Sequence, residues 1–164
     1  MIQQKVNFQQ MVNTTDSKPW RFMLFGGVAA GKTTLMKSLE SKSPQFAAKT
    51  QMVDYSGWGI DTPGEFIEMG HYRRVLVSTA FDAQLLIAVQ DATRIDPILP
   101  PNYFSMFSQP TIGVVTKMDH KEANADRAKA FLSNAGITGQ IFCVSALTGF
   151  GIPELRDFLM TGNI

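Results

Sequence analysis

The sequence has little of several features that would direct a chain away from an ordinary soluble fold. It contains one cysteine, Cys143, so no disulfide can form within the chain, and a reducing compartment is expected. It has no apolar run long enough to span a bilayer, and its first residues lack the charged-then-apolar order of a secretory signal. Its net charge of +1 gives no basis for electrostatic attraction to nucleic acid or anionic membranes. We therefore expect a cytoplasmic protein without nucleic-acid or membrane partners.

The chain does have the size and apolar content of one globular domain. Its 164 residues are 45% hydrophobic, enough to build a core without disulfides. Residues 1–20 are rich in Gln, Asn, Thr and Ser, and we predict that they form a polar extension outside the core. Apolar residues within this stretch leave open a short docking helix. The domain itself is expected to cover residues 21–164.

From residue 21 onward, apolar runs of strand type alternate with segments of helical periodicity. Strands are predicted at 21–26, 84–89, 111–115 and 140–144, and helices at 32–41, about 66–80, about 121–134 and 153–160. A short helix is expected to end the proline-rich segment 97–109. Two further runs, 50–55 and 58–61, are joined by Ser56-Gly57 and favour a hairpin. The order predicts a three-layer α/β fold with a mostly parallel sheet of six strands, including one antiparallel edge strand.

Residues 26–33 read GGVAAGKT and fit the phosphate-loop pattern G-x-x-x-x-G-K-[ST] between a predicted strand and a predicted helix. In such a loop, backbone N–H groups surround the α- and β-phosphates and the lysine, here Lys32, reaches the β- and γ-phosphates. The hydroxyl of Thr33 would bind Mg²⁺. A glycine-rich turn without a ligand is the alternative. The predicted nucleotide-binding residues are Gly26, Gly27, Val28, Ala29, Ala30, Gly31, Lys32, Thr33 and Thr34.

A second motif, Asp61-Thr62-Pro63-Gly64, follows the third predicted strand. A carboxylate at this position can hold Mg²⁺ directly or through water, so Asp61 is a predicted metal ligand. The N–H of Gly64 can approach a γ-phosphate, a contact that hydrolysis removes and that can drive an order–disorder switch. Thr50 precedes this motif. It could close over Mg²⁺ or simply begin the edge strand, and the residues leave both alternatives open.

A third motif, Thr116-Lys117-Met118-Asp119, closes the next-to-last predicted strand. Guanine presents two adjacent donors, N1–H and the N2 amino group, and the carboxylate of Asp119 can accept both. Adenine has no such pair of donors. The stem of Lys117 could lie across the purine face. The alternative is a solvated turn in which Asp119 caps the next helix.

After the last predicted strand, Ser145-Ala146-Leu147 would bring the N–H of Ala146 to the guanine O6, although the tripeptide alone carries little information. The predicted base-recognition residues are Thr116, Lys117, Asp119, Ser145, Ala146 and Leu147. GTP or GDP with Mg²⁺ is therefore the expected ligand.

In this order the four motifs resemble those of small GTPases of the translation-factor and Ras-like class. The stretches KTQMVDYSGWGIDTPGEFIE, VQDATRIDPILPPNYFSMF and CVSALTGFGIPELRDFL resemble more closely the ethanolamine- and propanediol-utilisation family of EutP/PduV type. The resemblance runs from about Phe22 to Leu159 and implies a P-loop NTPase domain of Ras-like architecture. It also implies a cytoplasmic protein associated with bacterial microcompartments, with shell or cargo proteins as partners. The N-terminal extension could then be a shell-targeting segment.

One position departs from the Ras-like pattern, since Glu65 stands where many such enzymes carry a water-orienting glutamine. We expect slow hydrolysis of GTP, ~10⁻⁴ to 10⁻² per second as in unassisted Ras-type enzymes. Two other functions stay open: a P-loop kinase that phosphorylates a small acceptor such as acetate, and a non-hydrolysing scaffold whose nucleotide supports folding or docking. The expected catalytic residues are Lys32, Thr33, Thr50, Gly64 and Glu65, and the expected metal ligands are Thr33, Thr50 and Asp61.

Overall fold

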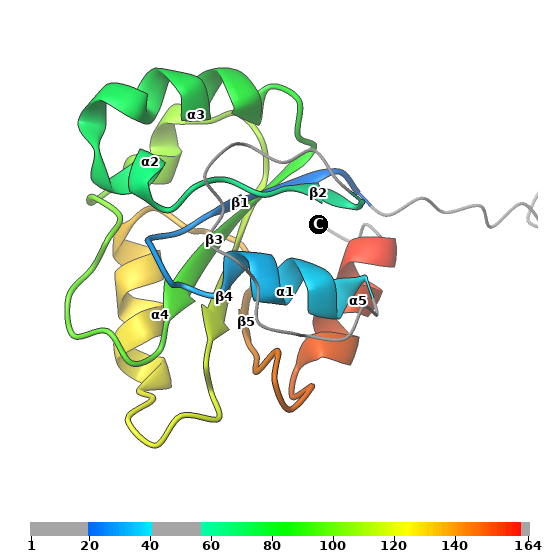
Figure 1. Ribbon diagram of the computed structural model, residues 1–164. Coiled ribbons are helices and arrows are strands. Elements are labelled where there is room, and N and C mark those ends of the chain that lie inside the picture. The colour runs from blue at the N-terminus through cyan, green and yellow to red at the C-terminus, as the bar shows by residue number, and fades with distance from the viewer. Residues whose placement is uncertain (1–19, 41–56, 162–164) are drawn as a thin grey trace, which may run out of the picture.

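A parallel β-sheet lies at the centre of the computed structural model, which describes residues 20–40 and 57–161 (Figure 1). The strands are β1 (Phe22–Phe25), β2 (Gly59–Ile60), β3 (Leu85–Asp91), β4 (Thr111–Thr116) and β5 (Ile141–Cys143). They lie in the order β2-β1-β3-β4-β5, and every neighbouring pair is parallel. Parallel strands need crossover connections, and the helices supply them.

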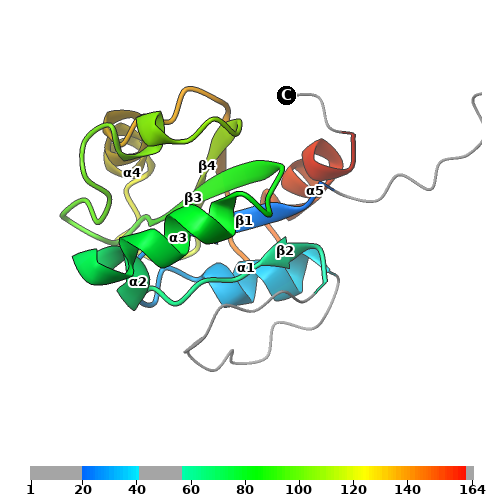
Figure 2. The same ribbon diagram turned by 90° about the horizontal axis from the view of Figure 1, so that it is seen from above.

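Helices cover both faces of the sheet, so the fold has three layers (Figures 1 and 2). The helical elements are α1 (Lys32–Leu39), α2 (Glu65–Glu68), the 3₁₀ turn η2 (Gly70–Tyr72), α3 (Arg73–Ala80), the 3₁₀ turn η3 (Tyr103–Met106), α4 (Ala125–Asn134) and α5 (Ile152–Thr161). The α/β architecture predicted from the sequence is thereby confirmed.

The alternation of side chains along each strand assigns the helices to the two faces. Phe22 and Leu24 of β1 belong to the core cluster that contains the apolar residues of α1 and α5. Met23 and Phe25 belong to the opposite cluster, which contains those of α3 and α4. All four residues of β1 are buried, as expected for a strand covered on both sides.

The sheet differs from the prediction in its strand number. Within the described ranges it has five strands and no antiparallel pair, instead of six strands with an antiparallel edge. The predicted run at 58–61 corresponds to β2, which pairs in parallel with β1 through Phe22 opposite Gly59. Its predicted antiparallel partner at 50–55 lies outside the described residues.

Two helix predictions need correction. The predicted helix at 66–80 is interrupted at Met69, whose φ of −105° and ψ of 108° are extended, and η2 then leads into α3. The helix predicted from about 121 begins only at Ala125, because the side chain of Asn124 accepts the N–H of Arg127 at 2.9 Å and caps it. The short helix expected near the end of segment 97–109 is the 3₁₀ helix η3. Across the described residues, no helix combines the length and apolarity required to cross a membrane.

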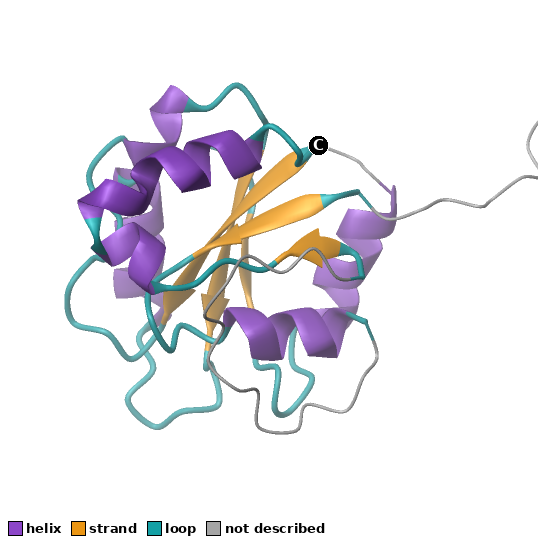
Figure 3. Ribbon diagram, turned by 45° about the horizontal axis from the view of Figure 1, so that its top comes forward, coloured by secondary structure: helices purple, strands orange, loops and turns teal. Residues whose placement is uncertain are grey.

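All five strands run in one direction, so their carboxyl ends meet at one edge of the sheet (Figure 3). In open parallel sheets the loops at this edge form the usual ligand site. Each of the four sequence motifs lies at the carboxyl end of one of these strands: β1, β2, β4 or β5. The fold therefore gathers the predicted site residues at a single edge.

Candidate functional site

The phosphate loop, residues 26–33, joins β1 to α1 and has an unusual backbone. Ala29 has a φ of +58° and Gly31 a φ of +88°. A positive φ is uncommon for a residue with a Cβ atom and is often found at functional sites. Gly26 is required by close packing, because a Cβ there would lie 2.8 Å from the carbonyl oxygen of Val89 on β3. The phosphate loop thus continues from β1 and packs against β3.

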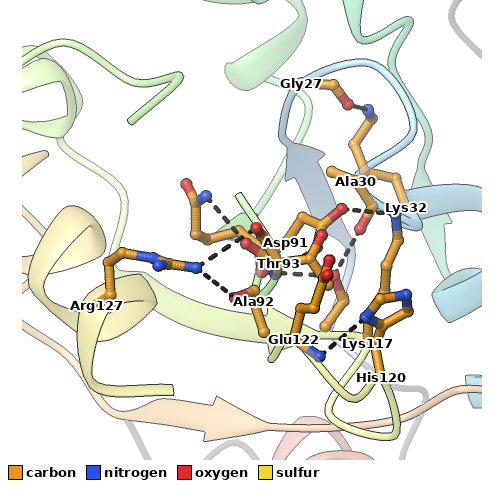
Figure 4. Close-up of polar contacts among 12 residues, drawn as sticks. Gly27, Ala30, Lys32, Asp91, Ala92, Thr93, Lys117, His120, Glu122 and Arg127 are labelled. Atoms are coloured by element: carbon orange, nitrogen blue, oxygen red, sulfur yellow. Dashed lines mark hydrogen bonds and ion pairs between the residues drawn. The ribbon is translucent and has the colours of Figure 1, made fainter. Parts of the chain in front are cut away.

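Lys32 is buried, at 6% exposure, with its ammonium group inside this loop. Its Nζ donates to the carbonyl oxygen of Gly26 at 2.8 Å and to that of Gly27 at 2.9 Å. The bond to Gly27 is drawn in Figure 4. Burial lowers the pKa of Lys32, and this effect is opposed by the charges of Asp61, Glu65 and Glu68. The loop therefore holds a positioned cation next to three carboxylates.

Thr33 and Asp61 form the second part of the site. The Thr33 hydroxyl donates to Oδ2 of Asp61 at 2.5 Å, and the side chain of Asp61 is buried. Hydroxyl and carboxylate oxygens this close together form a donor set that suits Mg²⁺. The described residues contain no group of three or more His, Cys, Asp or Glu side chains arranged to hold a metal. The Thr33 hydroxyl and the Asp61 carboxylate could supply part of the oxygen shell of Mg²⁺, with phosphate and water oxygens as the remaining ligands. Thr50, the third predicted ligand, lies outside the described residues.

The segment after β2 rests on the phosphate loop. The hydroxyl of Thr62 donates to the carbonyl of Leu24 at 2.7 Å, which ties this segment to β1. A Cβ on Gly64 would lie 2.4 Å from the backbone nitrogen of Val28, so only glycine allows this approach. On α2, Glu65 is half-buried, and Oε1 of Glu68 accepts the N–H of Val28 at 2.9 Å. The contact between Glu68 and Val28 could not be predicted from the motifs.

The third motif is joined to the phosphate loop by a hydrogen bond. The Thr116 hydroxyl donates to the carbonyl oxygen of Ala30 at 2.7 Å. The carboxylate of Asp119 is exposed, and its Oδ1 accepts the Ser145 hydroxyl at 2.6 Å. The cap of α4 is Asn124, so the alternative assignment of Asp119 as the helix cap is wrong. The structure thus brings Asp119 and Ser145 together at the same edge as the loop.

Lys117 is held by a residue that the sequence analysis missed. Its Nζ lies 2.6 Å from Oδ2 of Asp91, at the end of β3, and its backbone has a φ of +59° (Figure 4). Oδ1 of Asp91 also accepts the N–H and the hydroxyl of Thr93, at 2.8 and 2.7 Å. Burial by itself would raise the pKa of Asp91, but the hydrogen bonds from Lys117 and Thr93 together with the Lys117 charge lower it. Asp91 is therefore an ionised anchor for Lys117.

The last motif forms a tight turn after β5. The N–H of Thr148 donates to the Ser145 hydroxyl at 3.1 Å, and the N–H of Gly149 donates to the Ser145 carbonyl at 2.9 Å. Ala146 is half-buried, whereas Leu147 is 69% exposed. The turn holds Ser145 against Asp119 and leaves Leu147 at the surface.

A family pattern and two relatives of known name identify the same protein family for this chain. The pattern of the family described as "Ethanolamine utilisation - propanediol utilisation" (PduV-EutP) matches residues 20–161. The chain is 30% identical over 141 residues to "Probable acetate kinase EutP" of Escherichia coli (strain K12), covering 85% of this chain and 88% of that protein. It is 31% identical over 140 residues to "Propanediol utilization protein PduV" of Citrobacter freundii, covering 85% and 92%.

A solved structure shares the fold. The translation elongation factor SelB from Methanococcus maripaludis, in complex with the GTP analogue GppNHp, matches with a TM-score of 0.62 and 26% sequence identity. The match covers 89% of this chain but only 34% of that one, so the likeness concerns about a third of the elongation factor.

Proposed function

This chain belongs to the PduV-EutP family of ethanolamine and propanediol utilisation, and from that premise we propose that it binds guanine nucleotides and hydrolyses GTP slowly with Mg²⁺. The observation that carries the proposal is the link between the phosphate loop and the predicted base-recognition motif. The hydrogen bond from the Thr116 hydroxyl to the Ala30 carbonyl joins the phosphate loop to the motif that carries Asp119. The structure of SelB, described as a complex with a GTP analogue, supports the same ligand.

At the phosphate end, Lys32 would bind the β- and γ-phosphates through an ammonium already held by two loop carbonyls. Thr33 and Asp61 would hold Mg²⁺, which supplies neutralisation of the charge that develops on the phosphate oxygens. The N–H of Gly64 would contact the γ-phosphate. Thr50 is proposed as a further metal ligand from its position in the sequence alone.

At the base end, Asp119 would accept N1–H and the N2 amino group of guanine, and the N–H of Ala146 would donate to O6. Ser145 orients the Asp119 carboxylate, and the ion pair with Asp91 holds the Lys117 side chain for contact with the purine face. A site built on such hydrogen bonds rejects a ligand that lacks the partner groups by about 10⁴-fold. Adenine nucleotides should therefore bind weakly.

Hydrolysis would depend on Glu65, which lies beside Lys32 at the loop. A carboxylate can orient or deprotonate a water molecule, but it adds negative charge near the γ-phosphate. The rate should then be that of an unassisted enzyme, ~10⁻⁴ to 10⁻² per second.

Multiple-turnover phosphate release tests this function. GTP should give slow Mg²⁺-dependent release that acetate does not change, and ATP should give much less. No release from GTP, although GDP binds, would contradict hydrolysis and favour the scaffold function. Failure of GDP to bind would contradict the proposal as a whole.

A second candidate, phosphoryl transfer to acetate, has a specific observation in its favour: a relative 30% identical to this chain is named "Probable acetate kinase EutP". The same loop could position a γ-phosphate for an acetate oxygen in place of water. In the same assay, consumption of nucleotide that requires acetate and yields acetyl phosphate would establish the kinase and contradict the hydrolase.

We further propose a cytoplasmic location with shell or cargo proteins of a microcompartment as partners, on the basis of family membership. The predicted extension at 1–20 lies outside the described residues, and its role as a targeting segment is part of this proposal. Loss of co-sedimentation with purified microcompartments on deletion of residues 1–19 is the expected result. Unchanged co-sedimentation would contradict the targeting role.

A further inference from the structure

Glu68, the last residue of α2, is hydrogen-bonded to the phosphate loop. Its Oε1 accepts the N–H of Val28 at 2.9 Å. The same oxygen would lie 3.1 Å from a Cβ placed on Gly27, so the carboxylate sits directly over the first residues of the loop. Its charge also acts on the Lys32 ammonium. The side chain otherwise faces solvent, which allows it to move away without opening the core.

This end of the loop is the end assigned to the terminal phosphate. Gly64, whose N–H is proposed to contact the γ-phosphate, packs against Gly27 and Val28. Lys32, proposed to reach the β- and γ-phosphates, is bound to the carbonyl of Gly27. The Glu68 carboxylate thus lies among the groups proposed to bind the third phosphate, while the N–H groups that follow in the loop would contact the α- and β-phosphates.

We propose that Glu68 makes this protein bind guanosine diphosphate more tightly than guanosine triphosphate. Its carboxylate occupies the place where the terminal phosphate must bind. The proposal rests on the function proposed above. A carboxylate and a phosphate oxygen are both anionic acceptors, so they compete for the Val28 N–H and for the Lys32 charge. A diphosphate leaves the contact between Glu68 and Val28 in place, whereas a triphosphate displaces Glu68 and moves α2.

Substitution of Glu68 should change the affinity for a guanosine triphosphate but not the affinity for GDP. Binding of GDP and of the non-hydrolysable analogue GppNHp is measured with Mg²⁺ by calorimetry for the parent chain and for Glu68→Gln. Glu154→Gln on α5, an exposed change on an element distant from α2 in Figure 1, is the control. Thermal unfolding without nucleotide checks that each variant folds, and Glu68→Ala replaces the glutamine variant if it does not.

The measured quantity is the ratio of the GppNHp dissociation constant to that of GDP. In Glu68→Gln this ratio should fall about tenfold, equivalent to about 1.4 kcal/mol, with GDP affinity changed less than about twofold. The control should keep the parent ratio. A ratio that changes less than twofold while both nucleotides bind overturns the role of Glu68 and leaves the proposed function standing. Absence of binding of either nucleotide to the parent overturns the proposed function and this inference with it.

Discussion

Replacement of Asp91 by alanine should reduce both stability and nucleotide affinity, because this carboxylate joins the end of β3 to the lysine of the third motif. It accepts hydrogen bonds from the Thr93 N–H, the Thr93 hydroxyl and the Lys117 ammonium at 2.8, 2.7 and 2.6 Å. Asp91 itself is buried, at 6% exposure. Its removal leaves these donors without their acceptor.

The structure gives the size of the stability effect. Hydrogen bonds to a charged group contribute about 1.5–3 kcal/mol each. The side chain of Lys117 is 38% exposed, so its ion pair is discounted to about 0–1 kcal/mol. The two bonds to Thr93 would give about 3–6 kcal/mol at full value, but Thr93 is only half-buried, so water can reach its donors in the variant. Asp91→Ala should therefore lower the free energy of unfolding by roughly 2–4 kcal/mol, most of it from the bonds to Thr93. Asp91→Asn keeps an acceptor for Thr93 but loses the charge, and should cost about 1 kcal/mol.

Urea unfolding with a shared m-value measures these losses, and Asp157→Ala, an exposed change on α5, is the control. GDP titration adds the functional readout, because Lys117 without its anchor should bind the base about tenfold less well, a loss of about 1.4 kcal/mol. The reasoning is refuted if Asp91→Ala loses less than about 0.5 kcal/mol, the range of ordinary surface changes, and binds GDP as the parent does.

Three further predictions follow from the site. Gly64→Ala should destabilise the chain by about 1–3 kcal/mol, because the added Cβ would lie 2.4 Å from the Val28 nitrogen. Gly70→Ala is the control and should not destabilise the chain, because no heavy atom lies nearer than 4.0 Å to its added Cβ. Equal melting temperatures for the two variants would contradict the packing of Gly64 on the loop. Lys32→Ala should abolish the rise in melting temperature that GDP gives, and the exposed Lys129→Ala should keep it; an equal rise in the Lys32 variant would show that the loop does not bind phosphate. The pKa of Asp91 is lowered in the folded chain, so its stabilisation is present above the unfolded value and is lost as pH falls through the folded value. The difference in free energy of unfolding between the parent and Asp91→Asn should thus have its full size at pH 7 and decrease below about pH 4. A difference that does not change with pH would refute the stabilising role of the Asp91 charge.

Much of the fold could be predicted because its strands are short and strongly apolar. The runs that predicted β3 and β4 are buried on both faces, and the phosphate loop follows from a spacing pattern that requires a strand before it and a helix after it. The prediction of one helix over 66–80 missed the break at Met69, although Gly70 follows it and no residue of η2 is buried.

The missed site residues depend on contacts that are distant in sequence. Asp91 lies opposite Thr116 in the register of β3 with β4, and this brings it beside Lys117, 26 residues away in sequence. Without the register, an aspartate after an apolar strand suggests only a turn. Glu68 meets Val28 across 40 residues, and only because Gly64 lets α2 approach the loop. Sequence spacing therefore located the motifs, while the residues that hold them in place emerged from strand order and packing.

Calorimetric titration of the chain with GDP and with ADP, in the presence of Mg²⁺, tests the central claim most directly. The arrangement of Asp119, Ser145 and Lys117 in the motifs that follow β4 and β5 predicts saturable GDP binding and ADP binding weaker by about 10⁴-fold. Asp119→Asn should weaken GDP and favour the xanthine nucleotide, whose oxygen at C2 accepts from the new amide. Equal affinity for GDP and ADP, or no affinity for GDP, would contradict the account.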